Sequence, residues 1–323
     1  MTTYENTGSK DTRSGFGEGL YELGKTNPKV VALCADLIGS LKMNKFVAEN
    51  PTRFFQTGVA EANMTGVAAG LANGGYIPFA GTFAAFATGR VYDQIRQSVA
   101  YSNKNVKIAA SHAGLTLGED GATHQMLEDI ALMRVLPNMV VIAPGDSVEA
   151  EKATRALAQN GQPSYLRLAR EKTPIFSTED APFEIGKAYV LREGSDVSLF
   201  GTGTMTYQLL IAAKYLEQRG INAEVVHVPT IKPLDTETLL VSARKTGRVV
   251  TAEEAQAAGG FGSAVSEFLS EVLPMPIKRI GINDRFGESG APAELLEYFR
   301  LTGDAIADDV LAFTENMPRY HQE

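Results

Sequence analysis

The sequence predicts two consecutive α/β domains, and three observations carry this prediction. With 323 residues, the chain is about twice as long as an ordinary single domain. Short apolar runs of strand length alternate with segments whose apolar residues recur at helical spacing. The apolar runs are continuous, which is typical of strands in a parallel sheet that helices cover on both faces.

The first domain is predicted over residues 12–172, after a polar arm over residues 1–11. Its first helix, over residues 12–24, carries Phe16, Leu20 and Leu23 at helical spacing, and Pro28 lies just past its end. Further helices are expected over residues 61–73, 90–101, 126–135 and 147–159, the last of them capped by Ser147. Strands are expected over residues 30–37, 76–81, 106–111, 139–144 and 164–169.

A stretch that contains Pro174 and Pro182 but no periodicity predicts a linker over residues 173–185. The second α/β domain then spans residues 186–323. Its strands are expected over residues 197–200, 223–228, 249–252 and 277–282, and its helices over residues 205–219, 236–245, 261–272, 293–301 and 305–315. Active sites of such folds gather outside the carboxyl ends of the parallel strands, so functional side chains are expected there.

Composition and charge exclude several classes of protein. The chain is 44% hydrophobic and 21% charged, which is ordinary for a globular protein. It has no apolar run of about 18 residues, so no membrane span is expected. A polar N-terminus and the single cysteine, Cys34, favour a cytoplasmic protein. A net charge of -8 argues against nucleic acid as a partner and leaves an anionic substrate to local arginines.

Glu61 opens the helix predicted over residues 61–73, and the residues that follow it are mostly small. A cofactor or another backbone segment can therefore approach this helix closely. The carboxyl group would be poorly solvated there, and burial raises the pKa of a carboxyl group so that it can act as a protonated donor. The alternative is that the helix N-terminus favours an acidic residue without any further function.

A glycine-rich loop follows the strand predicted over residues 106–111. Its candidate side chains are His112, Glu119, Asp120 and His124. Two imidazoles and two carboxylates could ligate a metal, or bind a polyhydroxylated substrate and shuttle its protons. A solvated loop without function is the third interpretation.

Two phenylalanines and two arginines complete the candidates. Phe83 and Phe86 would ordinarily belong to the core, and they become a stacking platform only if a flat ring binds. Arg170 ends the strand predicted over residues 164–169 and is well placed for an anionic group. Arg13 has no comparable argument from its local sequence.

Taken in chain order, these segments resemble the pyrimidine-binding domain of the transketolase family. The matching segments are Val59-Ala60-Glu61, Thr82-Phe83-x-x-Phe86, His112-Ala113-Gly114 and Gly118-Glu119-Asp120-Gly121-x-Thr123-His124-Gln125. Later segments resemble that family's C-terminal domain, namely Pro229-Thr230-Ile231-Lys232-Pro233-Leu234-Asp235, Glu253-Glu254 and Gly259-Gly260-x-Gly262. The resemblance extends over residues 12–314 and corresponds to the second half of a full transketolase.

The resemblance implies thiamine diphosphate as cofactor. Glu61 would hydrogen-bond the ring nitrogen of its pyrimidine, and Phe83 and Phe86 would stack on or border that ring. His112 and His124 would contact oxygens of the sugar donor and assist proton transfer. With Glu61, these two histidines form the expected catalytic set.

The resemblance also assigns the remaining substrate contacts. Asp120 would bind a donor hydroxyl, Arg170 would hold a phosphate, and Arg13 matches a phosphate-binding arginine of the family. Two positions depart from the family pattern. Cys34 stands where a phosphate-contacting serine is common, and Gln256 where related chains often carry histidine.

The family binds the diphosphate and a divalent metal in a separate N-terminal domain, through a Gly-Asp-Gly motif that this chain lacks. The resemblance therefore implies the C-terminal subunit of a split transketolase, active only with an N-terminal-type partner subunit. That partner would bring most of the Mg²⁺ ligands, so no metal ligand is expected here. A heterotetramer with two copies of each subunit is expected.

The expected reaction transfers a two-carbon ketol unit from a ketose phosphate to an aldose phosphate, as in the pentose phosphate pathway. One alternative is the beta subunit of a 2-oxoacid dehydrogenase, but a small 2-oxo acid needs no hydroxyl-binding set such as Asp120 and His124. A 1-deoxyxylulose-phosphate synthase is normally one long chain. A non-catalytic remnant would have no use for Glu61. A metal hydrolase that uses His112, Asp120 and His124 is the last alternative.

Overall fold

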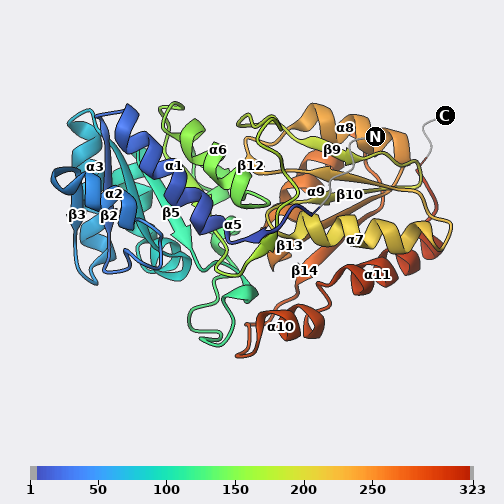
Figure 1. Ribbon diagram of the computed structural model, residues 1–323. Coiled ribbons are helices and arrows are strands. Elements are labelled where there is room, and N and C mark those ends of the chain that lie inside the picture. The colour runs from blue at the N-terminus through green and yellow to red at the C-terminus, as the bar shows by residue number, and fades with distance from the viewer. Residues whose placement is uncertain (1–5, 321–323) are drawn as a thin grey trace.

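The structure is a computed structural model that describes residues 6–320 (Figure 1). Residues 1–5 of the predicted polar arm lie outside the described residues. The chain builds a seven-stranded and a five-stranded sheet, with helices packed on both, and the two sheets lie side by side. The predicted class, two consecutive α/β units, is confirmed. No helix within residues 6–320 is long and apolar enough to cross a membrane.

The seven-stranded sheet has the order β12-β6-β7-β5-β4-β2-β3. Its strands are β2 (Val30–Cys34), β3 (Phe54–Gln56), β4 (Ile77–Phe83), β5 (Lys107–Ser111), β6 (Val140–Ile142), β7 (Ser164–Arg167) and β12 (Thr230–Lys232). All neighbours pair in parallel except β12, which runs antiparallel to β6. The predicted parallel sheet thus has one antiparallel edge, and that edge strand comes from the second half of the chain.

The segments around this sheet are mostly helical. They comprise α1 (Thr12–Thr26), α2 (Asn44–Glu49), the 3-10 turn η1 (Pro51–Arg53), α3 (Glu61–Asn73), the π-helical η2 (Ala85–Gly89), α4 (Tyr92–Gln94), the π-helical η3 (Ile95–Tyr101), the 3-10 turn η4 (Leu115–Leu117), α5 (Asp129–Arg134) and α6 (Ser147–Leu157). Alternate residues of β2 face opposite layers. Ala32 lies in one core cluster with Phe16 of α1, whereas Leu33 lies in another with Met64 of α3.

Two helix predictions in this half are corrected. The α-helix expected over residues 90–101 is wrong, because π-helical turns and the short α4 occupy this region. Apolar spacing alone does not distinguish these wider turns from an α-helix. The expected cap of α6, Ser147, is also wrong. Asp146 is the N-cap, and its carboxylate accepts hydrogen bonds from the backbone N–H groups of Val148 and Glu149, both at 3.0 Å.

The five-stranded sheet has the order β14-β13-β10-β11-β9, with only β9 antiparallel to its neighbour. Its strands are β9 (Tyr189–Arg192), β10 (Val197–Gly201), β11 (Ala223–His227), β13 (Val249–Gln256) and β14 (Ile277–Ile282). Its helices are α7 (Met205–Glu217), α8 (Thr236–Thr246), α9 (Phe261–Val272), α10 (Pro292–Tyr298) and α11 (Gly303–Asn316). Strand β13 runs four residues past its predicted end and carries Glu253 and Glu254 with it.

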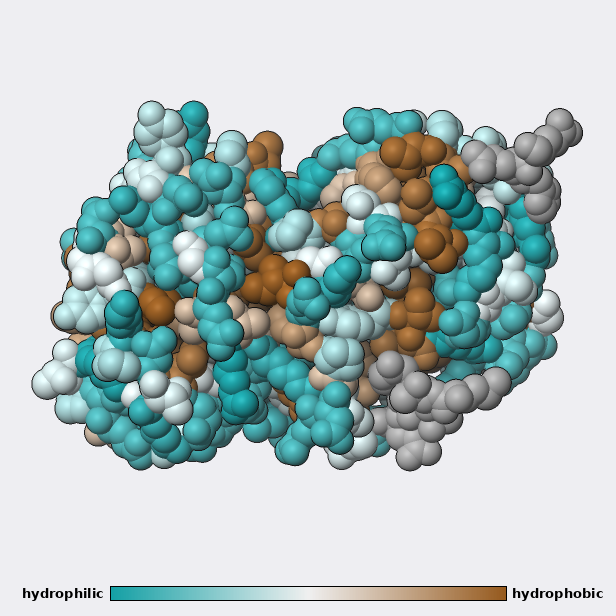
Figure 2. Space-filling model, turned by 90° about the horizontal axis from the view of Figure 1, so that it is seen from above, coloured by the Kyte–Doolittle hydropathy of each residue, from teal (hydrophilic) through white to brown (hydrophobic). Residues whose placement is uncertain are grey.

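Short strands tie distant parts of the chain together. In the predicted linker, β8 (Thr173–Pro174) pairs antiparallel with β1 (Ser9–Lys10). Seen from above, the surface is largely polar, and apolar residues gather near its middle and over the half that holds the second sheet (Figure 2). One buried core cluster contains Tyr165 of the first half and Phe200 and Val226 of the second, so the two halves share an apolar interface.

Candidate active site

Several of the side chains singled out from the sequence, among them Glu61, Phe83 and His112, lie where the parallel strands β4 and β5 end. Phe83 is the last residue of β4 and pairs in register with Ser111, the last residue of β5. His112 follows directly, and Glu61 opens α3, which packs against β4. This is the edge at which ligands of open α/β sheets bind.

Glu61 is buried, with only 3% of its surface exposed. Its Oε2 atom accepts a hydrogen bond of 3.1 Å from the guanidinium group of Arg90, whose side chain is half exposed. Arg90 was not singled out from the sequence, because it stands 29 residues further along the chain and the π-helical turn at residues 85–89 brings it back. No local pattern signals this pairing.

The rings of the site form a continuous array. Phe83 stacks on His112 with ring centroids 3.7 Å apart, and on Phe86 at 6.1 Å. His124 meets Phe86 edge to face at 5.4 Å. The guanidinium group of Arg90 also lies over the ring of Phe86, 4.1 Å from its centroid. Both phenylalanines therefore line the site instead of serving only the core.

His112 is held as a neutral imidazole. Its surface is 5% exposed, and burial, with the positive charges of Arg13 and Arg170, lowers its pKa to about 3. Its Nδ1 atom lies 2.8 Å from the Ser111 hydroxyl. The backbone of His112 has φ +59°, a conformation that costs a non-glycine residue about 1 kcal/mol and clusters at functional sites.

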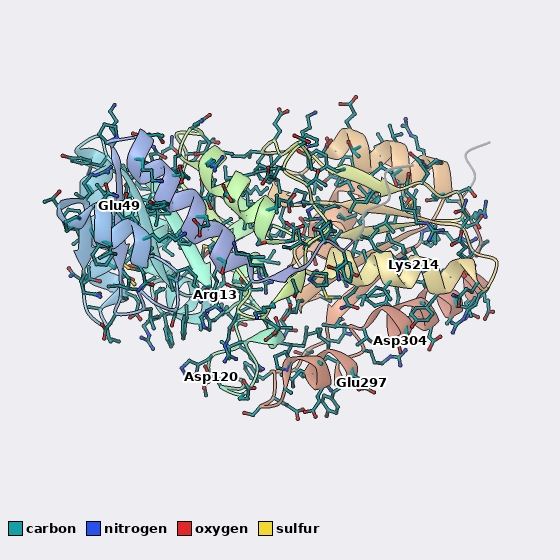
Figure 3. The ribbon with its side chains drawn as sticks, in the orientation of Figure 1. Arg13, Glu49, Asp120, Lys214, Glu297 and Asp304 are labelled. Carbon is teal, nitrogen blue, oxygen red and sulfur yellow. The ribbon has the colours of Figure 1, made fainter. Side chains whose placement is uncertain are left out.

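The β5–α5 loop, residues 112–128, carries the other candidates. Gln125 closes it, since its Nε2 donates to the carbonyl oxygens of Leu115 at 3.1 Å and Gly118 at 3.2 Å. Glu119 and Asp120 are exposed at its outer turn. Asp120 lies on this loop at the lower edge of the molecule in Figure 3, and the next residue, Gly121, packs against Ser289 of the segment before α10. Within residues 6–320, the Asp120 side chain makes no hydrogen bond or ion pair.

The two arginines are neighbours with different freedom. Arg13 donates to Asp11, to the carbonyl oxygen of Ser40 at 3.0 Å and to that of Arg170 at 2.9 Å, so its three guanidinium nitrogens are engaged. Burial lowers the pKa of Arg13. Arg170 uses one nitrogen for both Leu117 and Glu119, and 39% of its side chain is exposed. Arg170 is thus the more available cation.

Two further positions are placed by the structure. Cys34 is fully buried at the end of β2, and burial raises the pKa of its thiol to about 11, so it does not supply a negative charge. The side chain of Gln256 donates to the carbonyl oxygen of Arg285 and not into the site. No group of three or more His, Cys, Asp or Glu side chains that could hold a metal is found in the part of the chain that the structure describes.

Comparison with known proteins matches both halves of the chain. Residues 8–175 match the family model described as "Transketolase, pyrimidine binding domain", and residues 186–306 match "Transketolase, C-terminal domain". The chain is 48% identical to a putative transketolase C-terminal section of Methanocaldococcus jannaschii, over 94% of this chain and 96% of that one.

Two further matches are to subunits of transketolases. The chain is 44% identical to a 6-deoxy-6-sulfo-D-fructose transketolase subunit of a Clostridium species, over 94% of each chain. Among solved structures it resembles a split gene transketolase, described as an inactive beta4 tetramer, with a TM-score of 0.89 and 48% identity. That match covers 95% of this chain and 99% of the other.

Proposed function

The chain belongs to the transketolase family of thiamine-diphosphate-dependent enzymes, and from this premise we propose that it is the C-terminal subunit of a split transketolase. Its reaction would transfer a two-carbon ketol unit from a ketose phosphate to an aldose phosphate. Residues 12–172 would form the pyrimidine-binding domain and residues 186–323 the C-terminal domain. When bound, the cofactor supplies the carbon nucleophile that carries the ketol unit.

The observation that carries this proposal is the position of Arg90. Its planar guanidinium group donates a hydrogen bond to Glu61 and lies over the ring of Phe86. A pyrimidine that hydrogen-bonds Glu61 and stacks on Phe86 would make the same two contacts. Since Arg90 is half exposed, its side chain can swing into solvent when such a ring binds. The carboxylate and the ring therefore fit the pyrimidine end of thiamine diphosphate.

Each remaining side chain has a role that its surroundings support. Glu61 would hold a proton at the pyrimidine ring nitrogen. Neutral His112 would exchange a hydrogen bond with an oxygen of the donor sugar, and His124 would assist proton transfer at the same sugar. Asp120 is free to bind a hydroxyl group. Arg170 would contact the phosphate.

Arg13 would act one step away from the phosphate. It donates to the backbone oxygen of Arg170 and adds positive charge beside it. Its own nitrogens are already engaged, so we assign the direct phosphate contact to Arg170.

The proposal includes a partner. The chain has no Gly-Asp-Gly motif for the diphosphate, so an N-terminal-type subunit would bind the diphosphate and most of the Mg²⁺ shell. Two observations on relatives support this: one is described as a C-terminal section, and a similar solved tetramer of beta subunits is described as inactive. The active assembly would contain two copies of each subunit.

Reconstitution tests the function. The purified chain is mixed with the N-terminal-type subunit from the same source, thiamine diphosphate, Mg²⁺, a ketose phosphate as donor and an aldose phosphate as acceptor. Release of the aldose that is two carbons shorter than the donor is measured. Turnover is expected only with both subunits. A sulfonated ketose serves as a second donor, because the Clostridium relative is described as a sulfofructose transketolase subunit. Turnover by this chain alone, or no turnover of either donor by the mixture, would refute the proposal.

A further inference from the structure

The second half of the chain reaches the site through one buried carboxylate, Glu254 of β13. Its surface is 3% exposed. Its Oε1 atom accepts a hydrogen bond of 2.6 Å from the backbone N–H of Thr116, in the turn η4. Its Oε2 atom accepts one of 3.2 Å from the hydroxyl of Thr204, just before α7. Each oxygen therefore binds a different half of the protein.

The loop is shaped around this carboxylate. Gly114 has φ +86°, and a Cβ atom at this position would lie 2.4 Å from Oε1 of Glu254. Only glycine leaves room for the carboxylate and adopts this backbone conformation without strain. The backbone of Glu254 is fixed as well, because its carbonyl oxygen accepts a hydrogen bond of 2.8 Å from the buried Arg167 of β7.

Strand β13 also holds the far end of the β5–α5 loop. Two residues after Glu254, the backbone N–H of Gln256 donates to the carbonyl oxygen of Leu127 at 2.7 Å. Within the loop, the backbone N–H of Gly114 donates to the carbonyl oxygen of Met126 at 2.9 Å. This hydrogen bond joins the two ends of the loop, and we call the pair the neck of the loop. Gln125 extends the same contact to the second half of the chain by donating to the carbonyl oxygen of Glu288 at 2.9 Å.

The loop is therefore packed between β13 and the segment before α10, and Figure 1 shows it lying beside α10. His112 precedes this neck, and Asp120 and His124 lie beyond it. Thr116, which binds Glu254, lies between His112 and the other two residues in the chain. Burial raises the pKa of Glu254, while Arg167, the Thr116 N–H and the Thr204 hydroxyl stabilise its charged form.

We propose that Glu254 is a positioning residue of the sugar site, which sets the shape of the β5–α5 loop and so the placement of Asp120 and His124 relative to His112. The name of the site rests on the proposed function, whereas the control of the loop does not. Glu254 would thereby affect sugar binding through the loop and not by a contact of its own with the sugar.

Hydrogen exchange of the full chain tests the control of the loop. Glu254→Ala removes the acceptor of the Thr116 N–H, so exchange within residues 113–125 should rise about tenfold or more. Glu254→Gln keeps an oxygen acceptor and should stay close to the wild type. The matched control is Glu224→Ala, since Glu224 is an equally buried carboxylate of the second sheet that binds Ser242 and Lys245 instead.

In the reconstituted enzyme, Glu254→Ala should raise KM for the ketose about tenfold and leave the affinity for thiamine diphosphate unchanged. Glu254→Gln should restore KM. Unchanged exchange in Glu254→Ala, or an equal rise in Glu224→Ala, would overturn the proposal. So would a loss of cofactor affinity without a change in KM.

Two results keep the test decisive. If Glu254→Ala does not fold, Thr204→Val removes one tether of the carboxylate and should raise exchange in the same residues about twofold to threefold; no rise would overturn the proposal. If the wild-type mixture has no ketol transfer but the exchange results hold, only the proposed function fails.

Discussion

Replacing His112 should remove a pH-dependent loss of stability. The wild-type imidazole is buried and its pKa is lowered from 6.5 to about 3, whereas an unfolded histidine takes up a proton near pH 6.5. Between these values the unfolded chain binds a proton that the folded chain does not, so stability falls as pH falls. Each pH unit below 6.5 costs about 1.4 kcal/mol, which amounts to about 2 kcal/mol at pH 5.

Urea unfolding of the wild type and of His112→Asn at pH 7.5 and pH 5.0 measures this difference. The wild type should lose about 2 kcal/mol more than the variant on going to pH 5. His124→Asn is the matched control, because it removes a partly exposed imidazole from the same loop and should follow the wild type. Equal losses in the wild type and His112→Asn would refute the assignment of a neutral, buried His112.

Three other predictions concern single side chains. In the reconstituted complex, Glu61→Ala should lose well over tenfold in rate at limiting thiamine diphosphate, and wild-type activity of this variant would exclude the role given to Glu61. Arg170→Ala should raise KM about tenfold for phosphorylated ketoses and far less for unphosphorylated ones, and equal effects in the two kinetic series would remove the phosphate contact. Lys107 is buried at the start of β5, and burial lowers its pKa to about 7. Because an unfolded lysine keeps its proton to about pH 10.4, wild-type stability should rise by roughly 2 kcal/mol relative to Lys107→Met between pH 7 and pH 9, as measured by urea unfolding. If the stability of the wild type and of Lys107→Met changed equally with pH, the lowered pKa of Lys107 would be contradicted.

The sequence predicts those elements whose cause is local. Helix α3 and helix α9 begin and end at the predicted residues, because small or apolar periodicity is bounded there by glycine or by a change of pattern. The π-helical turns near residue 90 and the strand β12 were not predicted. The π-helical turns are missed because apolar spacing does not show how many residues each turn contains. Strand β12 is missed because it forms only by pairing with β6, which lies far away in the sequence.

The site residues likewise fall into those that the sequence predicts and those that only the structure shows. Glu61, the phenylalanine pair and the histidine loop are found from sequence because each motif is compact and its residue types are rare in such segments. Arg90 and Glu254 are missed because each contacts the site from a distant part of the chain. Only the packing of α3 on β4, and of β13 under the loop, makes them neighbours.

Strand β12 makes the two halves of the chain unsuited to separate expression. It pairs with β6 from the opposite unit, and the buried His227 of the second half lies 2.7 Å from Glu149 of the first. A fragment that ends before residue 186 would lack β12 and leave one edge of β6 unpaired. Such an exposed strand edge can pair with other chains, so the fragment is expected to aggregate. A protease cut inside the predicted linker, by contrast, should leave a nicked protein whose two pieces elute together.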